Sequence, residues 1–416
     1  MKGIRHGGFA AFLVVALLLL AACGGSGASN TTTTESGSSS GGSASSSGGS
    51  ASSGGNGPGA GIPEGPVKIG IQAPLSRDYA LEGQGFVNAV QLLADQLNAQ
   101  GGIDGHKVEI MAEDDQGVAQ QASVAAQRLV SQGVVAVVGG YNSTATEAAQ
   151  PVYDENHVIQ VTPASTAVGL SQKGYKYFFR TATLDSSQGA FAADLMVNQL
   201  GKKNIAILHD NSTYGAGLAE ETRSAVEKLS GKVVFYDAIT PGGNDFGAVL
   251  TKLKGAKPDV VYFTGYFSDA GLLLRQAKDL GIDATWIGGD ANNNPQVVDV
   301  AGAAAEGFMV TTPPQPQDLD TPEAQQFVQD YQKKYGELPP SIWTISAADA
   351  FRVIVEAIRQ AGSTDPDAIA SALHGLKDFP GFSGPITFAE NGDREGSLHV
   401  AYVIKDRKFV RYDANK

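Results

Sequence analysis

The chain has 416 residues, a formal net charge of −13 and a pI near 4.9. Surfaces that bind nucleic acid need clustered Lys and Arg to neutralise phosphates, so this charge balance argues against a nucleic-acid partner. The length suffices for two lobes with separate hydrophobic cores.

A secretory signal peptide is predicted at residues 1–22. Lys2 and Arg5 precede an unbroken apolar run over 9–20, and two alanines follow it, which is the pattern of a cleaved export signal. The alternative is a membrane-spanning helix, but the run is shorter than the ~20 apolar residues that cross a bilayer. An exported protein is therefore expected.

A lipid anchor is predicted at Cys23, the only cysteine of the chain. It directly follows Leu-Ala-Ala, and this resembles the lipobox of bacterial lipoproteins, which implies that Cys23 is lipidated and becomes the mature N-terminus. Residues 24–61 are almost entirely small or polar, with Glu35 as their only charge. Such a segment has no apolar face to bury, so 23–62 is predicted to be the lipidated cysteine and a disordered tether. The expected location is the outer face of the cytoplasmic membrane, or the periplasm.

From residue 63 onward, short β-branched segments alternate with longer segments of helical period. The predicted strands, in chain order, are 67–72, 108–112, 134–138, 158–161, 204–208, 233–238, 260–264, 285–288, 307–310 and 399–404. The predicted helices are 83–100, 119–132, 144–156, 188–200, 216–229, 246–253, 269–280, 322–335 and 346–360. This alternation is typical of α/β proteins, in which helices cover both faces of a parallel sheet. Thr144 and Glu147 predict a capping box at the start of one helix.

Three of these strands end at glycine and are followed by a polar or aromatic side chain, in segments 137–143, 262–266 and 286–290. Ligands of open α/β sheets bind outside the carboxyl ends of the strands, and glycine there permits close approach. We therefore expect the three turns to line one cleft. Asp290 is the one acidic residue among them, and it is a candidate partner for a ligand ammonium; a solvated loop aspartate is the alternative.

A fourth turn, 161–166, also ends a strand. It supplies two hydroxyls and backbone N–H groups where a helix begins, and such donors suit a carboxylate. Ordinary helix capping by Ser and Thr is the alternative.

Several segments, in their order and spacing, resemble the leucine/isoleucine/valine-binding proteins, the amino-acid branch of the type I periplasmic binding fold. They are 69–76, 114–115, 162–164, 180–181, 209–215 and 384–388, and the likeness runs over 66–412. The resemblance implies two doubly wound parallel-sheet lobes joined by three hinge crossings, near 183–186, 312–314 and 398–401. Lobe 1 is then 63–184 plus 313–398, and lobe 2 is 185–312 plus 399–416. The lobes would close on a ligand by bending at the crossings.

The same resemblance implies the ligand contacts. Ser143 matches the serine that meets the ligand carboxylate, with Asn142 beside it. The stretch that completes the carboxylate site matches Ala164, Ser165 and Thr166. The aromatic residue that closes over the ligand matches Tyr214, a further tyrosine matches Tyr266, and the acid that pairs with the α-ammonium matches Asp290.

The first loop departs from the family pattern, because Glu82 stands where amino-acid binders commonly place an aromatic residue. If Glu82 faces the cleft, an aliphatic ligand side chain would strip water from a carboxylate without supplying a partner, which favours a more polar amino acid or an amide-like solute. If Tyr79 takes the aromatic role instead, selectivity for branched-chain amino acids survives.

The predicted function is that of the solute-binding lipoprotein of an ABC importer, a monomer that binds a small amino acid and docks on the permease subunits. A ligand sensor with the same fold is an alternative. Enzymatic activity is not expected, since the sequence contains no phosphate-binding loop of the Walker type, no paired zinc histidines and no Gly-x-Ser-x-Gly turn. Neither a cofactor nor a metal is expected.

Overall fold

The computed structural model describes residues 61–413. The predicted signal peptide, Cys23 and all but the last two residues of the predicted linker lie outside the described residues. Ile62 already packs against the hydrophobic core, so the folded part begins slightly before residue 63. None of the helices within 61–413 has the length and hydropathy needed to cross a bilayer.

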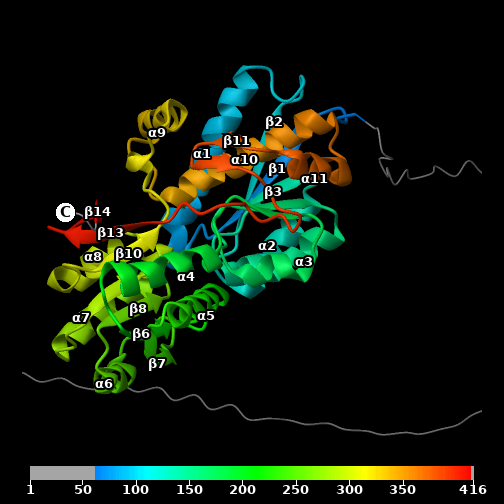
Figure 1. The fold of residues 1–416 in the computed structure, drawn as a ribbon. Coiled ribbons are helices and arrows are strands. Elements are labelled where there is room, and N and C mark those ends of the chain that lie inside the picture. Colours follow the sequence, from blue (N-terminus) through cyan, green and yellow to red (C-terminus); the bar gives the residue numbers. More distant parts are fainter. Residues whose placement is uncertain (1–60, 414–416) are drawn as a thin grey trace, which may run out of the picture. The chain divides into compact units, whose positions relative to one another are not determined.

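The first sheet consists of five parallel strands in the order β2-β1-β3-β4-β5 (Figure 1). Their bounds are β1 Val67–Ala73, β2 Val108–Asp114, β3 Ala136–Gly139, β4 Ile159–Thr162 and β5 Phe178–Arg180. Ile69 of β1 pairs with Ile110 of β2 on one side and with Ala136 of β3 on the other. Four of these strands agree with the prediction; β5 was not predicted, because three residues carry too little pattern.

Helices cover both faces of the first sheet. They are α1 Ala80–Ala99, α2 Ala119–Ser131, α3 Ser143–Glu155, α9 Pro322–Tyr335, α10 Ile342–Ala361 and α11 Pro366–Gly375, with the 3-10 turns η1 Arg77–Tyr79 and η2 Val168–Lys173. Ala136 and Val138 pack into the core on the side of α1 and α10, whereas Val137 packs on the side of α2 and α3. This alternation follows from the two-residue period of a strand. A short antiparallel pair, β11 Phe379–Gly381 and β12 Gly384–Ile386, follows α11.

The second sheet has seven strands in the order β14-β13-β10-β9-β8-β6-β7. Their bounds are β6 Asn204–His209, β7 Lys232–Ala238, β8 Val260–Thr264, β9 Thr285–Gly288, β10 Met309–Thr312, β13 Val400–Lys405 and β14 Lys408–Arg411. Strands β6 to β10 are parallel, while β13 runs antiparallel to β10 and β14 antiparallel to β13. Asp406 and Arg407 join the last two strands with positive φ angles of 50° and 63°, the conformation that a two-residue hairpin requires.

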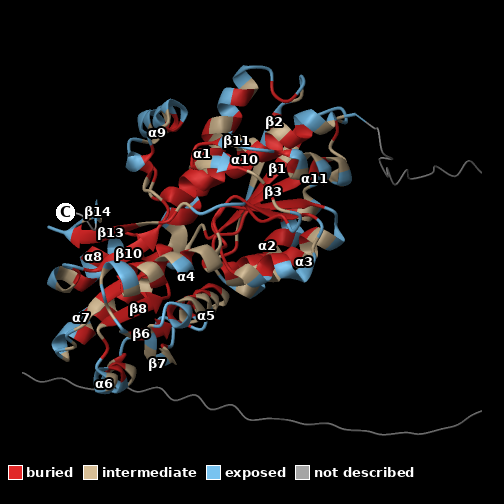
Figure 2. Cartoon of the chain, viewed as in Figure 1, coloured by how far each residue is buried: buried red, intermediate tan, exposed pale blue. Residues whose placement is uncertain are grey.

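Helices also cover both faces of the second sheet. They are α4 Asp185–Asp194, which continues as the π-helical turn η3 Leu195–Gln199, then α5 Thr213–Lys228, α6 Gly247–Ala256, α7 Phe267–Asp279 and α8 Gln296–Ala301, with the 3-10 turns η4 Asp290–Asn292, η5 Gly302–Ala304 and η6 Pro316–Asp318. Tyr262 of β8 faces the core on the side of α4 and α5, while Val261 and Phe263 face α6 and α7. Figure 2 shows the central strands buried and the outward helix surfaces exposed, while the edge strands β7 and β14 are intermediate or exposed. The α/β fold with two parallel-sheet layers is thus confirmed.

The chain passes between the two sheets three times. It leaves the first sheet after β5, returns to the helices of the first sheet after β10, and enters the second sheet again at β13. The second sheet is therefore built from two separate stretches of sequence, whereas the first sheet comes from one stretch and only its helices come from two. The carboxyl ends of β3, β4, β8 and β9 supply the turns in which ligand-binding residues were predicted.

Candidate functional site

A small cavity lies between residues of the two sheets. Its volume is about 10 Å³, and it is lined by Tyr141, Ser143, Ala164, Tyr214, Tyr266, Asp290, Ala291 and Trp343. The four turns predicted to carry the site all contribute to this lining, together with the start of α5 and of α10. A larger open pocket of about 410 Å³ surrounds the amino-terminal ends of β9 and β10. It contains none of the predicted site residues and lies at the wrong ends of the strands for an α/β ligand site.

Hydrogen-bond donors form the wall of the cavity on the side of the first sheet. Ser143 is the first residue of α3, and its Oγ accepts a hydrogen bond from the backbone N–H of Ala167 at 3.4 Å. Thr166 is buried, and its hydroxyl has no hydrogen-bond partner among residues 61–413. The start of a helix attracts negative charge. This wall therefore suits a carboxylate.

Ser165, by contrast, is not brought to the cavity. Its hydroxyl lies 2.7 Å from that of Thr146 and donates to the carbonyl oxygens of Gly140 and Tyr141, each at 3.2 Å. Because a fully buried hydroxyl needs partners, this side chain joins the β3 and β4 turns to each other. The prediction that Ser165 contacts the ligand through its side chain is therefore not supported by its position.

Two buried carboxyl groups lie near the cavity: Asp290 lines it on the side of the second sheet, and Asp185 lies beside Thr166. Asp290 begins η4 directly after β9 and is 3% exposed. Burial raises the pKa of Asp290 to about 7, and a hydrogen bond from Tyr214 partly opposes that shift. Burial also raises the pKa of Asp185 well above its usual value, and the charge of Asp290 raises it further. The Thr166 hydroxyl lies near the Asp185 carboxylate, but neither oxygen of Asp185 meets hydrogen-bond geometry with another described group. This pair of acids suits a cation.

Close packing places Tyr214 beside Asp290. A Cβ on Gly289 would overlap the Tyr214 hydroxyl, so only glycine at this position lets the tyrosine reach the end of β9. The Tyr214 hydroxyl also lies 3.5 Å from the backbone N–H of Ala291. The glycine at this strand end thus makes room for a side chain, whereas we expected it to make room for the ligand.

An aromatic cluster surrounds the cavity. The ring of Tyr79 lies 5.0 Å from that of Tyr266 and 5.7 Å from those of Tyr141 and Phe267, measured between centroids. Tyr266 is in turn 5.3 Å from Tyr214. Burial raises the pKa of the Tyr266 hydroxyl, and a hydrogen bond from Asn142 opposes that shift. Tyr79 thus packs within this cluster, although it is not among the residues that line the cavity.

Glu82 has other partners. Its Oε1 accepts a hydrogen bond from Asn294, and its Oε2 accepts one from Ser341, the residue that caps α10. Burial raises the pKa of Glu82, and these two hydrogen bonds oppose the shift. Asn294 follows η4 of the second sheet, so Glu82 links the two sheets and does not line the cavity. The alternative in which Glu82 faces the ligand is not supported by its position.

The predicted capping box of Thr144 and Glu147 is wrong, and both side chains instead take part in a second link between the helices of the two sheets. Helix α3 begins one residue earlier, at Ser143, with Asn142 as its N-cap. Thr144 donates a hydrogen bond to the hydroxyl of Thr213 at 3.1 Å, and Thr213 donates to Glu147 at 2.8 Å. The side chains at the start of α3 thus bind the start of α5.

Sequence reasoning missed three residues of the site. Asp185 looks like an ordinary acidic residue in the first turn of a helix, and only the fold places it beside Asp290. Tyr141 belongs to a predicted turn but was not singled out, although an aromatic residue next to a strand-end glycine was a usable signal. Trp343 reaches the cavity from α10, more than 170 residues away along the chain from Thr166. Within 61–413, no group of three or more His, Cys, Asp or Glu side chains is arranged to hold a metal ion.

Comparisons with known proteins identify the family of this chain. A family model described as periplasmic binding protein matches residues 66–408. The leucine-, isoleucine-, valine-, threonine- and alanine-binding protein of Pseudomonas aeruginosa is 35% identical over 336 residues, which cover 81% of this chain and 89% of that protein.

Two solved structures are similar over most of their length. A leucine-binding protein from Thermotoga maritima has a TM-score of 0.77 and 30% identity, covering 83% of this chain and 98% of that one. The branched-chain amino acid transporter substrate-binding protein of Streptococcus pneumoniae, solved in complex with isoleucine, has a TM-score of 0.75 and 30% identity, covering 83% and 97%. On the strength of the family match and of the two helix-covered sheets that meet at one cavity, the chain belongs to the periplasmic binding protein family.

Proposed function

We propose that this chain is the substrate-binding component of an ABC importer and that its ligand is a small amino acid of the branched-chain class. The names of its relatives support the transport role, since they include a branched-chain amino acid transporter substrate-binding protein and binding proteins for leucine, isoleucine and valine. The permease subunits of such a transporter are the proposed protein partners. No catalytic role is proposed.

The observation that carries the proposal is the opposite chemistry of the two walls of one cavity. Among the lining residues, Ser143 at the start of α3 offers a donor to a carboxylate, while Asp290 offers negative charge to an ammonium. Thr166 and Asp185 are buried beside one another outside this lining, with side-chain oxygens that have no hydrogen-bond partner among residues 61–413. An α-amino acid carries both groups on neighbouring carbon atoms. We therefore assign the ligand carboxylate to the first wall and the ligand ammonium to the second.

The remaining lining supports an apolar side chain on the ligand. Tyr141, Tyr266 and Trp343 present aromatic surface, and Tyr79 packs on two of these rings. The nearby carboxyl group of Glu82 is engaged by protein donors. An aliphatic side chain placed here would bury apolar surface without stripping water from an unpaired charge.

The size of the cavity supports a mechanism in which two lobes open and close. About 10 Å³ is close to the space that one water molecule needs, so an amino acid enters only when the two walls separate. We propose that 63–184 plus 313–398 move as lobe 1 and 185–312 plus 399–416 as lobe 2, bending at the three crossings. Ligand contacts from both walls then favour the closed state over the open one.

Family membership supports a location outside the cytoplasm. We further propose that the protein is exported by its signal peptide and held at the membrane through lipidated Cys23, as a monomer. Two acyl chains on one cysteine give stable anchoring, whereas a single chain binds a bilayer only marginally.

Isothermal titration calorimetry with a panel of amino acids tests the proposal. We expect saturable 1:1 binding of one or more of L-leucine, L-isoleucine and L-valine, and far weaker binding of D-leucine, L-glutamate and L-lysine. Ser143→Ala should weaken binding, while Ser230→Ala, which changes an exposed residue in the turn after α5, serves as the control. Failure of every L-amino acid to bind would refute the assigned ligand class.

A further inference from the structure

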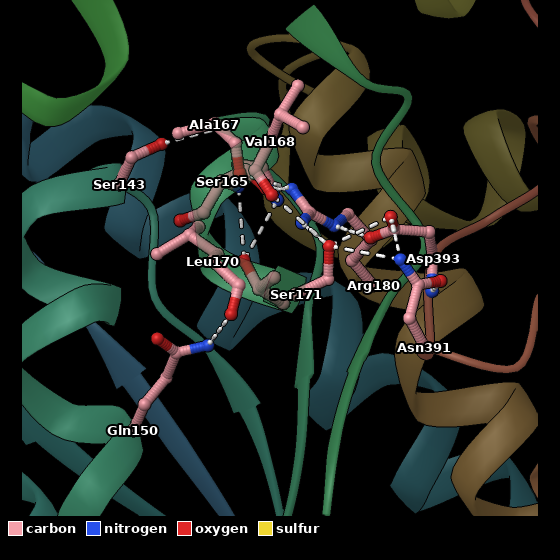
Figure 3. A network of polar contacts seen from close by, with 12 residues as sticks. Ser143, Gln150, Ser165, Ala167, Val168, Leu170, Ser171, Arg180, Asn391 and Asp393 are labelled. Carbon is pink, nitrogen blue, oxygen red and sulfur yellow. Dashed lines mark hydrogen bonds and ion pairs between the residues drawn. The ribbon is translucent and has the colours of Figure 1, made fainter. Parts of the chain in front are cut away.

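A buried arginine lies directly behind the turn that forms the donor wall. Arg180, the last residue of β5, is 0% exposed, and Figure 3 shows its guanidinium group among the backbone of 165–171 and the side chains that follow β12. One terminal nitrogen, Nη1, donates to the carbonyl oxygens of Ser165 and Ala167, each at 3.0 Å. The other, Nη2, donates to the hydroxyl of Ser171 at 3.1 Å.

An aspartate from a distant part of the chain fixes this arginine. Asp393 forms an ion pair with Nε of Arg180 at 2.6 Å. The second carboxylate oxygen of Asp393 accepts hydrogen bonds from Ser171 at 2.9 Å and Asn391 at 2.8 Å. The backbone N–H of Arg180 also donates to the carbonyl of Gly392 at 3.0 Å. The segment after β12 thus holds the guanidinium group on several sides.

These contacts decide which way the turn faces. The carbonyl oxygens of Ser165 and Ala167 point to Arg180, and that of Thr166 accepts the backbone N–H of Asp185 at 3.0 Å. A carbonyl oxygen aimed at a carboxylate would repel it. Three successive carbonyl groups are thus held away from the cavity. The backbone N–H groups of Ala164 and Ser165 donate to the Thr162 hydroxyl, and that of Ala167 donates to the Oγ of Ser143. The Thr166 hydroxyl has no hydrogen-bond partner among residues 61–413 and is left as a donor for the ligand.

We infer that Arg180, held by Asp393, is a positioning residue for the ligand carboxylate: it touches no ligand but fixes the orientation of the 164–167 turn. This inference deepens the proposed function and rests on it. It assigns a role in binding to the segment 391–393, which lies more than 200 residues from the turn along the sequence and contributes nothing to the cavity lining.

A second buried arginine in the same lobe provides the control. Arg394 is also buried, and it donates to the carbonyl oxygens of Thr181, Gly384 and Pro385. Its contacts hold the β11–β12 hairpin and not the donor turn. Arg394→Lys therefore perturbs a comparable network without touching the turn.

Two measurements on the whole protein test the inference: hydrogen exchange of backbone amides without ligand, followed by mass spectrometry, and calorimetric titration with L-leucine. Asp393→Asn should speed exchange in 163–171 and weaken L-leucine binding by about tenfold or more, the effect of losing a hydrogen-bonded charge. Asn391→Ala, at an exposed position, should act in the same direction with smaller amplitude. Arg394→Lys should speed exchange at 379–386 and leave the L-leucine affinity within about twofold, because the hydrogen bonds of Arg394 go to Thr181 and to 383–385 and not to the 164–167 turn.

Each outcome decides a different question. If wild-type protein does not bind L-leucine, the result counts against the proposed ligand. The exchange data still report whether Asp393 holds the turn. If wild-type protein binds L-leucine, two results would show that the positioning role is wrong. In the first, Asp393→Asn speeds exchange at 163–171 but leaves the L-leucine affinity unchanged. In the second, Asp393→Asn leaves exchange at 163–171 unchanged and alters the affinity no more than Arg394→Lys does.

Discussion

The affinity for an amino acid should depend on the protonation of Asp290. Burial raises the pKa of this carboxyl group to about 7 in the unliganded protein. A bound ammonium group would favour the charged form and lower that pKa, so binding below pH 7 must release a proton. At pH 5 only about one molecule in a hundred carries a charged Asp290, and the Kd should be about a hundredfold higher than at pH 8. At pH 6 binding should release close to one proton.

Replacement of Asp290 by Asn removes the titrating group while keeping its shape. Binding should weaken by at least ~30-fold at pH 8, since the ligand ammonium loses one of its two proposed counter-charges and only Asp185 remains. The Kd of the variant should then change less between pH 5 and 8 than that of the wild type, because Asp185 is the only one of the two acids left to titrate. The unliganded variant should also be more stable at pH 8, by an amount on the order of 4 kcal/mol, because a pKa raised by about three units reflects a folded state that disfavours the charge. That stability difference should vanish toward pH 4, where the wild-type carboxyl is protonated.

Titration calorimetry at pH 5, 6, 7 and 8, in two buffers of different ionisation enthalpy, measures both the Kd and the proton release. Asp269→Asn is the matched control, because Asp269 is a buried acid of the same sheet layer whose pKa is raised to about 6 by burial, outside the cavity lining. It should keep the pH dependence of the wild type. A wild-type Kd that is constant between pH 5 and 8, or an Asp290→Asn variant that retains the same slope, would refute this reasoning.

Three further predictions concern other parts of the chain. Burial lowers the pKa of His399 to about 4. As the pH falls from 7 to 4, the wild type should therefore lose about 3 kcal/mol of unfolding free energy relative to His399→Gln, because the unfolded chain takes up the proton first. Urea unfolding at each pH measures this difference, and an equal loss of stability in both proteins would contradict the prediction. Asn294→Ala removes the hydrogen bond to Glu82 that joins the two sheets. Because this bond should stabilise the closed state, calorimetry should find ligand binding weakened by about fivefold. An unchanged Kd would show that the bond does not favour closure. Cys23→Ser should move the protein from the membrane fraction to the soluble fraction after cell fractionation, and retention on the membrane would rule out the lipid anchor.

Most strands of the parallel sheets were predictable because each is a local run rich in β-branched residues, while β5 is too short to show such a run. The antiparallel direction of β13 and β14 was not, since a strand's partner lies elsewhere in the chain. Helix α11 was missed although it carries a signal: Pro366 at its first position, and Asp365, whose side chain accepts from the backbone N–H of Ala368 at 3.0 Å. That pairing of a cap with proline is a usual start of a helix.

The site was predictable only in part, for a physical reason. Ser143, Asp290 and Tyr266 follow strand ends, and the topology of an α/β sheet brings strand ends together regardless of side-chain detail. The role of Glu82 depends on Asn294 and Ser341, which are 212 and 259 residues away. Sequence alone gave no means of pairing them.

The most direct test of the account is a crystal structure of the protein with bound L-leucine. The account predicts the leucine carboxylate within hydrogen-bond distance of Ser143 and Thr166, and the ammonium group between Asp290 and Asp185. A leucine bound with these ends reversed, or bound outside the cavity that these residues surround, would contradict it.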